Sequence, residues 1–74
     1  METFFCKTLI ELRKSRFLTQ YELAELSGIN EKYYGKIERG ESFPTMKIFF
    51  YICNALDIPP SDFMLYMERL QDDL

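Results

Sequence analysis

The sequence of 74 residues contains no histidine and no tryptophan, and it has only three glycines, three prolines and two cysteines. The absence of histidine removes the commonest general base of enzymes and the commonest metal ligand of proteins. Cys6 and Cys53 lie far apart and form no C-x-x-C pair, so we expect no metal centre and no cofactor. We predict that both are small buried apolar residues in a reducing compartment and do not form a disulfide.

The sequence also lacks the residue patterns of a catalytic site. It has no phosphate-binding loop and no clustered carboxylates, so no nucleophile, base or metal is expected in one cleft. The longest apolar run, residues 48–53, is far too short to span a bilayer. The N-terminus shows no basic segment followed by a long apolar stretch, as a secretory signal peptide requires. We therefore predict a protein that is not an enzyme, lies in the cytoplasm and has no membrane partner.

The charge of the chain is unevenly distributed. Nine basic and twelve acidic residues give a net charge of −3, whereas nucleic-acid-binding domains are usually basic. Residues 1–56 carry eight basic and seven acidic groups, while residues 57–74 carry one basic and five acidic groups. The acidic C-terminal part could therefore face away from a polyanion. A content of 47% apolar residues suits the single small core that a chain of this length allows.

Apolar residues at helical spacing predict an all-α protein with five helices, at about residues 3–16, 20–27, 31–39, 46–56 and 62–72. Thr19 and Glu22 have the spacing of a capping box. Asn30, Thr45 and Ser61 are expected to cap the starts of the third, fourth and fifth helices. Gly28 and Gly40 are expected to end the second and third helices. No internal repeat divides the chain.

The same periodicity assigns some residues to the interior. In the second helix it places Leu23, Ala24 and Leu26 inward. The apolar run at residues 48–52 predicts that the fourth helix is central in the fold. Gly35 lies in the middle of the third helix, where glycine costs about 1 kcal/mol relative to alanine. Such a residue predicts the close approach of another backbone or of a ligand.

The second and third predicted helices, with Gly28 between them, have the spacing of a helix-turn-helix at about residues 20–39. The sequence resembles the lambda-repressor/Cro-like helix-turn-helix family over residues 9–63. The resemblance is carried, in order, by Leu12-Arg13, Leu18-Thr19-Gln20, Glu22-Leu23-Ala24, Ser27-Gly28-Ile29, Tyr33, Ile37-Glu38-Arg39-Gly40, Pro44-Thr45 and Ala55-Leu56. It implies a five-helix lambda-repressor-like DNA-binding domain, with residues 64–74 as a C-terminal helix extension and possible dimerisation element.

This resemblance implies that the third helix enters the major groove of duplex DNA. The residues it assigns to base reading are Glu31, Lys32, Lys36 and Gln20. Lysine donates to guanine O6 and N7, and glutamate accepts from cytosine N4. The alternatives are a solvated face for the two lysines, a plain surface glutamine at position 20, and a Glu31 that only complements the helix N-terminus.

Further residues match positions that contact the DNA backbone or support the fold. The backbone contacts implied are Thr19, Gln20, Asn30, Tyr33, Ser42, Thr45 and Lys47, although helix capping alone would explain Thr45. Tyr34 and Ile37 match positions that the family buries. Arg13 and Glu38 match a structural ion pair between the first and third helices. Phe43 has no predicted role.

The C-terminal helix predicts a homodimer. At 100° per residue, Phe63, Tyr66, Met67, Leu70 and Leu74 fall within one stripe. We expect Phe63 and Tyr66 to pack on the core of the same chain. The dimer interface is predicted at Phe63, Met67, Leu70 and Leu74, with the fourth helix as the alternative. A two-fold contact would place two recognition helices about 34–36 Å apart, as a palindromic operator requires.

Together these features predict a sequence-specific duplex-DNA-binding transcriptional regulator, a small dimeric repressor or autoregulator. A restriction-modification controller, a phage-type repressor and an antitoxin would share this pattern. The alternative is a protein-interaction module that has the helix-turn-helix fold but does not bind DNA, which the net charge of −3 favours slightly. The donors Gln20, Lys32 and Lys36 distinguish the two, because a module that binds only protein needs no donors on that face. Any further protein partner is unknown.

Overall fold

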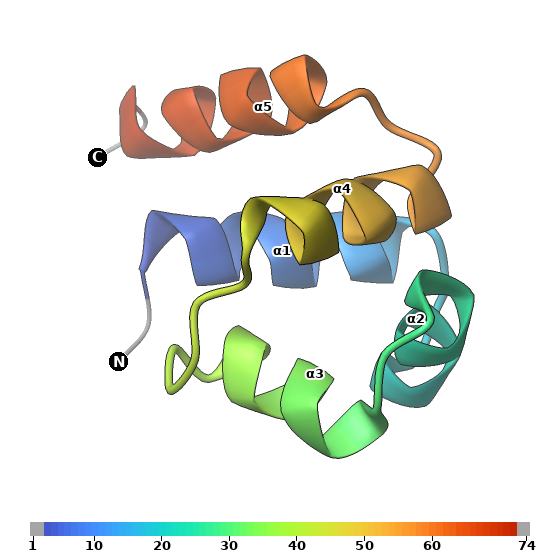
Figure 1. Ribbon diagram of the computed structural model, residues 1–74. Helices are drawn as coiled ribbons and strands as arrows, with labels where there is room; N and C mark the ends of the chain where they lie inside the picture. The colour runs from blue at the N-terminus through green and yellow to red at the C-terminus, as the bar shows by residue number, and fades with distance from the viewer. Residues whose placement is uncertain (1–2, 73–74) are drawn as a thin grey trace.

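The computed structural model describes residues 3–72, which form five α-helices and no strand. These are α1 (Phe4–Ser15), α2 (Gln20–Ser27), α3 (Glu31–Glu38), α4 (Met46–Ala55) and α5 (Pro60–Asp72). In Figure 1, α5 lies on one side, α1 and α4 form the middle, and α2 and α3 lie on the other side. The prediction of an all-α fold with five helices is confirmed. None of the described helices has the length and apolar character needed to cross a membrane.

The expected start signals begin α2, α3 and α4. Thr19 and Glu22 form the predicted capping box, with hydrogen bonds of 3.0 and 2.8 Å between side chain and backbone. The side chains of Asn30 and Thr45 accept from the backbone N–H three residues later, at 3.0 and 3.2 Å. Gly28 ends α2 with a φ of +73°, a left-handed conformation that glycine adopts without steric cost.

The predicted start of the last helix was wrong. Ser61 does not cap α5, because the helix already begins at Pro60. The carbonyl of Pro59 accepts from the backbone N–H of Asp62 at 2.9 Å and of Phe63 at 3.1 Å. Proline suits the first helical position, since its missing N–H would have no partner there and its φ is already helical. Pro60 is therefore the first residue of α5, and the preceding Pro59 supplies the first carbonyl acceptor.

The core is built from apolar residues of all five helices. Phe5, Phe49 and Phe63 form an aromatic cluster between α1, α4 and α5, with ring centroids 5.0 to 5.9 Å apart. The other buried members are Leu9, Leu12, Leu23, Ala24, Tyr34, Ile37, Ile52, Cys53 and Leu56. Cys6 and Cys53 are both buried and free, as predicted.

Three apolar residues that the sequence assigned to the interior are instead exposed. Leu26 of α2 is 61% exposed, and Phe50 and Tyr51 of α4 are 47% and 45% exposed. A helix buries only the sides that neighbouring helices cover, and the core side of α4 carries Phe49, Ile52 and Cys53. The prediction that the run at residues 48–52 is central was therefore wrong for Phe50 and Tyr51.

The turn between α1 and α2 contains an unusual residue. Phe17 has a φ of +57° and is 93% exposed. Its neighbours are tied down, because Arg16 Nε donates to the carbonyl of Leu56 at 2.8 Å and the Leu18 N–H donates to the carbonyl of Arg13 at 3.2 Å. A β-carbon in this conformation costs free energy that glycine would not. The turn is thus held in place by residues on both sides of a strained position.

Candidate nucleic-acid interface

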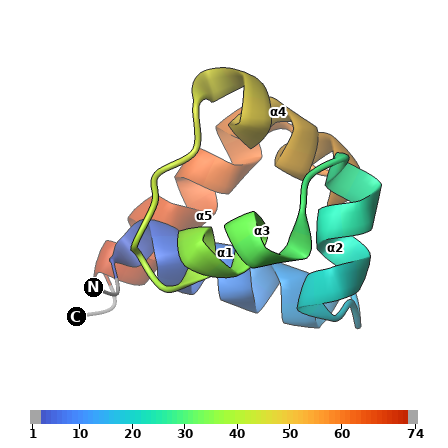
Figure 2. The ribbon, with the colours of Figure 1, turned by 60° about the horizontal axis from the view of Figure 1, so that its bottom comes forward.

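The helices α2 and α3 are joined by the tight turn at residues 28–30, and Figure 2 shows both with this turn between them. The backbone N–H of Ile29 donates to the carbonyl of Ala24 at 3.0 Å, which closes the end of α2. The Ile29 side chain packs against the core. Tyr34 and Ile37 pack α3 against the core, and their predicted burial is confirmed. The opposite side of α3 is left open to solvent.

The three residues of α3 that the sequence assigned to base reading all lie on the surface. Glu31, Lys32 and Lys36 are exposed. Lys32 and Lys36 are four residues apart and therefore lie one above the other on the same side of the helix. Glu31 is the first residue of α3, where a carboxylate also complements the helix dipole.

Gln20, the first residue of α2, is held from the end of α3. Its side-chain Nε2 donates to Glu38 Oε1 at 2.8 Å, and the glutamine is half-buried. This bond fixes the direction of the amide before any ligand arrives. The amide nitrogen carries two N–H donors, so the one not directed at Glu38 can donate to another group.

The Glu38 carboxylate, with a side chain only 3% exposed, is the centre of a buried network. Arg13 donates to it through Nε at 2.7 Å and Nη2 at 3.3 Å, so the two residues form an ion pair between α1 and α3. The hydroxyl of Tyr34 donates to Oε2 of the same carboxylate. Together with Gln20, these residues surround the negative charge with donors, as a buried carboxylate requires. One side chain thus connects α1, α2 and α3.

The ionisation of this network follows from its contacts. Burial raises the pKa of Tyr34 far above its ordinary value, and the bond to Glu38 raises it further. The hydroxyl therefore stays protonated and remains a donor. The hydrogen bond to Glu38 likewise raises the pKa of Arg13, which stays cationic.

The space at Gly35 is bordered by side chains, which the sequence did not predict. A Cβ atom at this position would lie 3.0 Å from Nη1 of Arg39 and 3.8 Å from Oε1 of Gln20. The group that approaches is therefore a side chain of the same helix end, so the expectation of another backbone was wrong, while the expectation of a ligand stays a prediction. The Arg39 Nε in turn donates to Glu41 Oε2 at 2.7 Å. This pair was missed from the sequence, because a two-residue separation across a helix end carries no periodic signal.

The residues assigned to the DNA backbone are spread over several segments of the chain. Thr19, Asn30 and Thr45 are exposed and act as helix caps. Tyr33 and Ser42 are half-buried, and Tyr33 packs against the core. Lys47 is exposed, and its Nζ lies 5.8 Å from the centroid of the Tyr51 ring. These residues come from the starts of α2, α3 and α4 and from the segment between α3 and α4.

Not all of the residues predicted for the dimer interface are exposed enough to contact a second copy of the chain. Phe63 is 0% exposed, because its ring packs in the aromatic cluster, so its assignment to a dimer contact was wrong. Met67 is half-buried against the core and Leu70 is also half-buried. Tyr66, expected to pack on the core, is 39% exposed. Leu74 lies outside the described residues.

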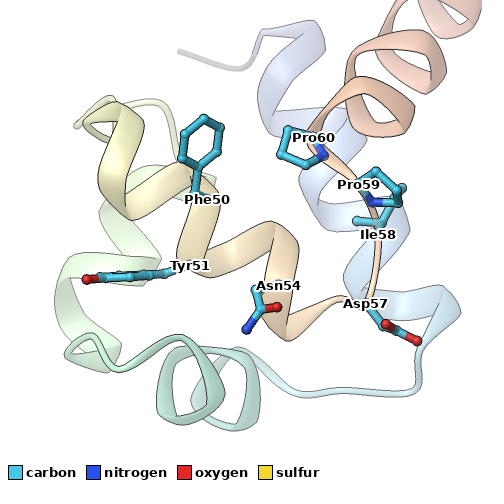
Figure 3. A pocket seen from close by; sticks show the side chains of 7 residues that line it. All are labelled: Phe50, Tyr51, Asn54, Asp57, Ile58, Pro59 and Pro60. Carbon is cyan, nitrogen blue, oxygen red and sulfur yellow. The ribbon is translucent and has the colours of Figure 1, made fainter.

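A different apolar surface is exposed where α4 and α5 meet. Phe43 is 73% exposed, Met46 62%, Phe50 47% and Met64 45%, and we call these four residues the α4–α5 face. A hollow of about 120 Å³ in this surface is lined by Phe5, Phe43, Pro44, Met46, Phe49, Met64 and Met67. Phe50 also borders an open pocket of about 570 Å³, shown in Figure 3, with Tyr51, Asn54, Asp57, Ile58, Pro59 and Pro60. The sequence had given Phe43 no role, and the structure places it at one end of this surface.

Comparison with known proteins gives matches over most of the chain. A family model described as helix-turn-helix matches residues 9–63. The HTH-type transcriptional regulator SutR of Escherichia coli (strain K12) is 38% identical over 61 residues, which are 82% of this chain and 34% of that protein. This chain therefore spans about a third of the length of that relative.

Solved structures of similar fold include proteins of comparable and of greater length. The restriction-modification controller protein C.AhdI from Aeromonas hydrophila is 37% identical with a TM-score of 0.78, covering 81% of this chain and 91% of that one. An HTH_3 family transcriptional regulator from Vibrio cholerae is 36% identical with a TM-score of 0.80, covering 90% of this chain and 38% of that one.

Proposed function

The chain belongs to the helix-turn-helix family whose model matches residues 9–63, and we propose that it is a sequence-specific, DNA-binding transcriptional regulator. The observation that carries the proposal is the exposed side of α3, where Lys32 and Lys36 lie together. Gln20, the first residue of α2, is bonded to Glu38 at the end of the same α3 helix. SutR and the Vibrio cholerae protein are named transcriptional regulators. The proposed function is binding without a chemical step, in the cytoplasm.

Among the regulators expected from the sequence, a restriction-modification controller is the kind that the comparisons favour. C.AhdI carries that description, and the similarity extends over 91% of its length. We therefore propose that the chain acts as a small repressor or autoregulator of this kind.

In the proposed complex, the open side of α3 lies in the major groove. Lys32 and Lys36 donate to guanine O6 and N7, and Glu31 accepts from cytosine N4. Gln20 contributes a donor that Glu38 has already oriented, so little side-chain freedom is lost when DNA binds. The contacts to the DNA backbone come from the caps and the segment after α3: Thr19, Gln20, Asn30, Tyr33, Ser42, Thr45 and Lys47.

The net charge of −3 is compatible with this function because of where the acidic residues lie. Asp62, Glu68 and Asp72 belong to α5, which Figure 1 places on the opposite side of the molecule from α3. Their repulsion of the phosphates is reduced by distance and by salt, since the screening length at physiological ionic strength is about 8 Å. The side that carries α3 is the less acidic one.

We propose that the protein binds a palindromic operator as a homodimer, and that the α4–α5 face forms the contact. Four neighbouring apolar side chains on that face are between 45% and 73% exposed, and a second copy would remove them from water. The face contains no residue of α2 or α3, the helices that carry the proposed base contacts. A dimer also doubles the number of phosphate contacts, which offsets the small positive charge of one DNA-binding side.

The test is selection of bound duplexes from a pool of random DNA sequences at low salt. The expected result is one enriched sequence with two-fold symmetry, bound with an affinity that falls steeply as salt rises. Lys36→Ala should cost about 1–3 kcal/mol on that sequence if this lysine reads a base.

Arg69→Ala serves as the matched control, because it removes one positive charge from α5 on the far side of the molecule. It should leave affinity and sequence preference nearly unchanged. A pool that yields no enriched sequence would exclude sequence-specific DNA binding, and the protein-interaction module would take its place.

A further inference from the structure

Each of the helices α1 to α4 ends in a backbone arrangement that requires one residue in the left-handed conformation. Two N–H groups after the helix donate to carbonyls of its last turn, as in a Schellman motif. The left-handed residue is a glycine after α2 and α3, at Gly28 and Gly40. After α1 and α4 it is Phe17 and Asp57, with φ of +57° and +56°. Two helix ends therefore carry a side chain where glycine would have no steric cost.

The Phe17 ring is the most exposed large apolar side chain of residues 3–72, at 93%. Its backbone is fixed, because the N–H groups of Phe17 and Leu18 donate to carbonyls of α1 at 2.9 and 3.2 Å. Two exposed cations, Lys14 and Arg16, lie within three residues of it in the chain. An exposed ring on a backbone that phenylalanine adopts only at a cost contributes little to the fold of one copy. Such a position is typical of a residue that contacts another molecule.

The end of α4 borders a pocket that is large enough to receive an aromatic ring. Its volume is about 570 Å³, and we call it the Phe50–Pro60 pocket; the lining consists of Phe50, Tyr51, Asn54, Asp57, Ile58, Pro59 and Pro60. A cavity of about 150 Å³ already holds benzene. Figure 3 shows Phe50 and Pro60 near one end of this pocket and Asn54 and Asp57 near the other. The lining is thus mainly apolar and carries one carboxylate.

One hydrogen bond places Phe17 next to this pocket. Arg16 Nε donates to the carbonyl of Leu56 at 2.8 Å, so residues 16 and 17 lie beside residues 56 and 57. Figure 1 shows the connection from α1 to α2 and the connection from α4 to α5 at the same end of the molecule. Phe17 is not among the residues that line the pocket. The ring and the pocket are therefore neighbours, but the ring does not fill the pocket of its own chain.

We propose that the Phe17 ring of one copy of the chain occupies the Phe50–Pro60 pocket of a second copy, which returns the same contact. Charge complementarity supports a second copy as the occupant, because cations flank the ring and a carboxylate lines the pocket. A ring and a pocket that lie side by side are also exchanged by one two-fold axis, so the contact closes. It is independent of DNA binding, and it shares only Phe50 with the α4–α5 face.

The test uses Phe17→Gly, because glycine suits the backbone conformation at this position. An isotope-labelled sample of this variant keeps the pocket but lacks the ring. Unlabelled wild type added to it should progressively shift the backbone amide resonances of residues 50–60 in NMR spectra, because a ring enters the pocket. Unlabelled Phe17→Gly is the matched control and should leave these resonances in place. Association through the α4–α5 face is common to both additions and cancels.

A second substitution tests the charge of the pocket. In the labelled protein, Asp57→Asn should raise the wild-type concentration needed for a half-maximal shift about threefold, the effect expected for one exposed ion pair. Asparagine tolerates the left-handed conformation, so the fold should be retained. Asp62→Asn is the control, since it makes the same charge change in the first turn of α5, outside the pocket lining. It should leave the half-maximal concentration unchanged.

Equal shifts from unlabelled wild type and unlabelled Phe17→Gly would overturn the proposal, because the ring would then have no part in the contact. The absence of any shift at residues 50–60 with millimolar wild type would overturn it as well. Either result leaves the proposed DNA binding intact, since no duplex is present. If Phe17→Gly does not fold, Phe17→Asn replaces it, because asparagine also adopts this conformation.

Discussion

Gln20 and Glu38, 18 residues apart in the chain, share a hydrogen bond of 2.8 Å that joins the start of α2 to the end of α3. The residue that the proposed function places on DNA is thus held by a carboxylate that is itself buried. Because Arg13 and Tyr34 donate to the same carboxylate, the orientation of Gln20 depends on residues that never reach the surface of α3.

Replacing Gln20 tests its proposed contact with DNA. Gln20→Ala removes a donor to DNA but leaves Glu38 bonded to Arg13 and Tyr34. We expect about a tenfold loss of duplex affinity and a loss of about 1.5 kcal/mol in the free energy of unfolding, because the buried carboxylate of Glu38 also loses one donor. Duplex titration and urea denaturation measure the two quantities. An equal affinity for wild type and variant would remove Gln20 from the interface.

The ion pair of Arg13 and Glu38 should dominate the stability of the helix-turn-helix. Arg13→Ala leaves a buried carboxylate with only neutral donors, so we expect a loss of about 3 kcal/mol in the free energy of unfolding. Arg39→Ala is the matched control, since its pair with Glu41 is exposed and exposed pairs contribute little. Urea denaturation of both variants gives the comparison. Similar values for the two would mean that burial does not strengthen the Arg13 pair.

Tyr34 should make the stability depend on alkaline pH. Its pKa is raised by burial and by Glu38 above the unfolded value of about 10, so the folded state keeps a proton that the unfolded state releases. This contribution is fully present below pH about 10 and is lost as the pH rises toward the folded-state pKa. Denaturation midpoints between pH about 8 and about 11 should therefore fall more steeply for the wild type than for Tyr34→Phe.

Tyr21→Phe provides the control for that series, because Tyr21 is 55% exposed. Burial also raises the pKa of Cys53, to about 11, but this thiol is present in every variant and cancels in the comparison. Parallel pH profiles for the wild type and Tyr34→Phe would contradict the assignment of the effect to Tyr34.

Phe17 should be a position where a smaller residue stabilises the protein. Phe17→Gly relieves the left-handed conformation at φ +57°, and an aromatic ring that is 93% exposed contributes little burial. We expect a gain of about 1 kcal/mol in the free energy of unfolding. Asp57→Gly, at φ +56°, should gain less, because aspartate tolerates this conformation better than phenylalanine. Thermal melting of both variants tests the difference, and a less stable Phe17→Gly would point to a role of the ring itself.

The α4–α5 face should control the oligomeric state. The double variant Met46→Asp, Met64→Asp places two charges in the exposed apolar surface, so a dimer through that surface should dissociate. Leu65→Asp is the control, since Leu65 is 47% exposed and borders a different pocket, together with Asp62 and Tyr66. Sedimentation at micromolar concentration distinguishes the cases. A monomeric wild type, or a double variant that still dimerises, would exclude this interface.

Features that depend on a few neighbouring residues could be predicted from the sequence. The capping box at Thr19 and the end of α2 at Gly28 are local, because each is decided within one turn of helix. The exposure of Leu26 and Phe50 could not be predicted in the same way. Both continue an apolar pattern, but the pattern does not say where the covering helix ends. Phe63 shows the same ambiguity, since an apolar stripe can pack on its own core or on another copy.

The candidate site was predictable in its residue types but not in its connections. Lys32 and Lys36 are found on the exposed side of α3 because helical spacing alone separates them from Tyr34 and Ile37. The bond from Gln20 to Glu38 requires the angle between α2 and α3, which no local pattern gives. The position of the Arg39 side chain could be predicted only if the missing side chain of Gly35 were interpreted as space for another side chain of the same helix.

The eight residues of α3 divide their tasks by side. Tyr34, Ile37 and Glu38 attach the helix to the rest of the protein, while Lys32 and Lys36 have no part in that attachment. Under the proposed function, the two lysines and Glu31 could be exchanged for other residues without loss of the fold. A library randomised at these three positions should therefore give folded proteins with new operator preferences, which makes α3 a practical starting point for the design of regulators.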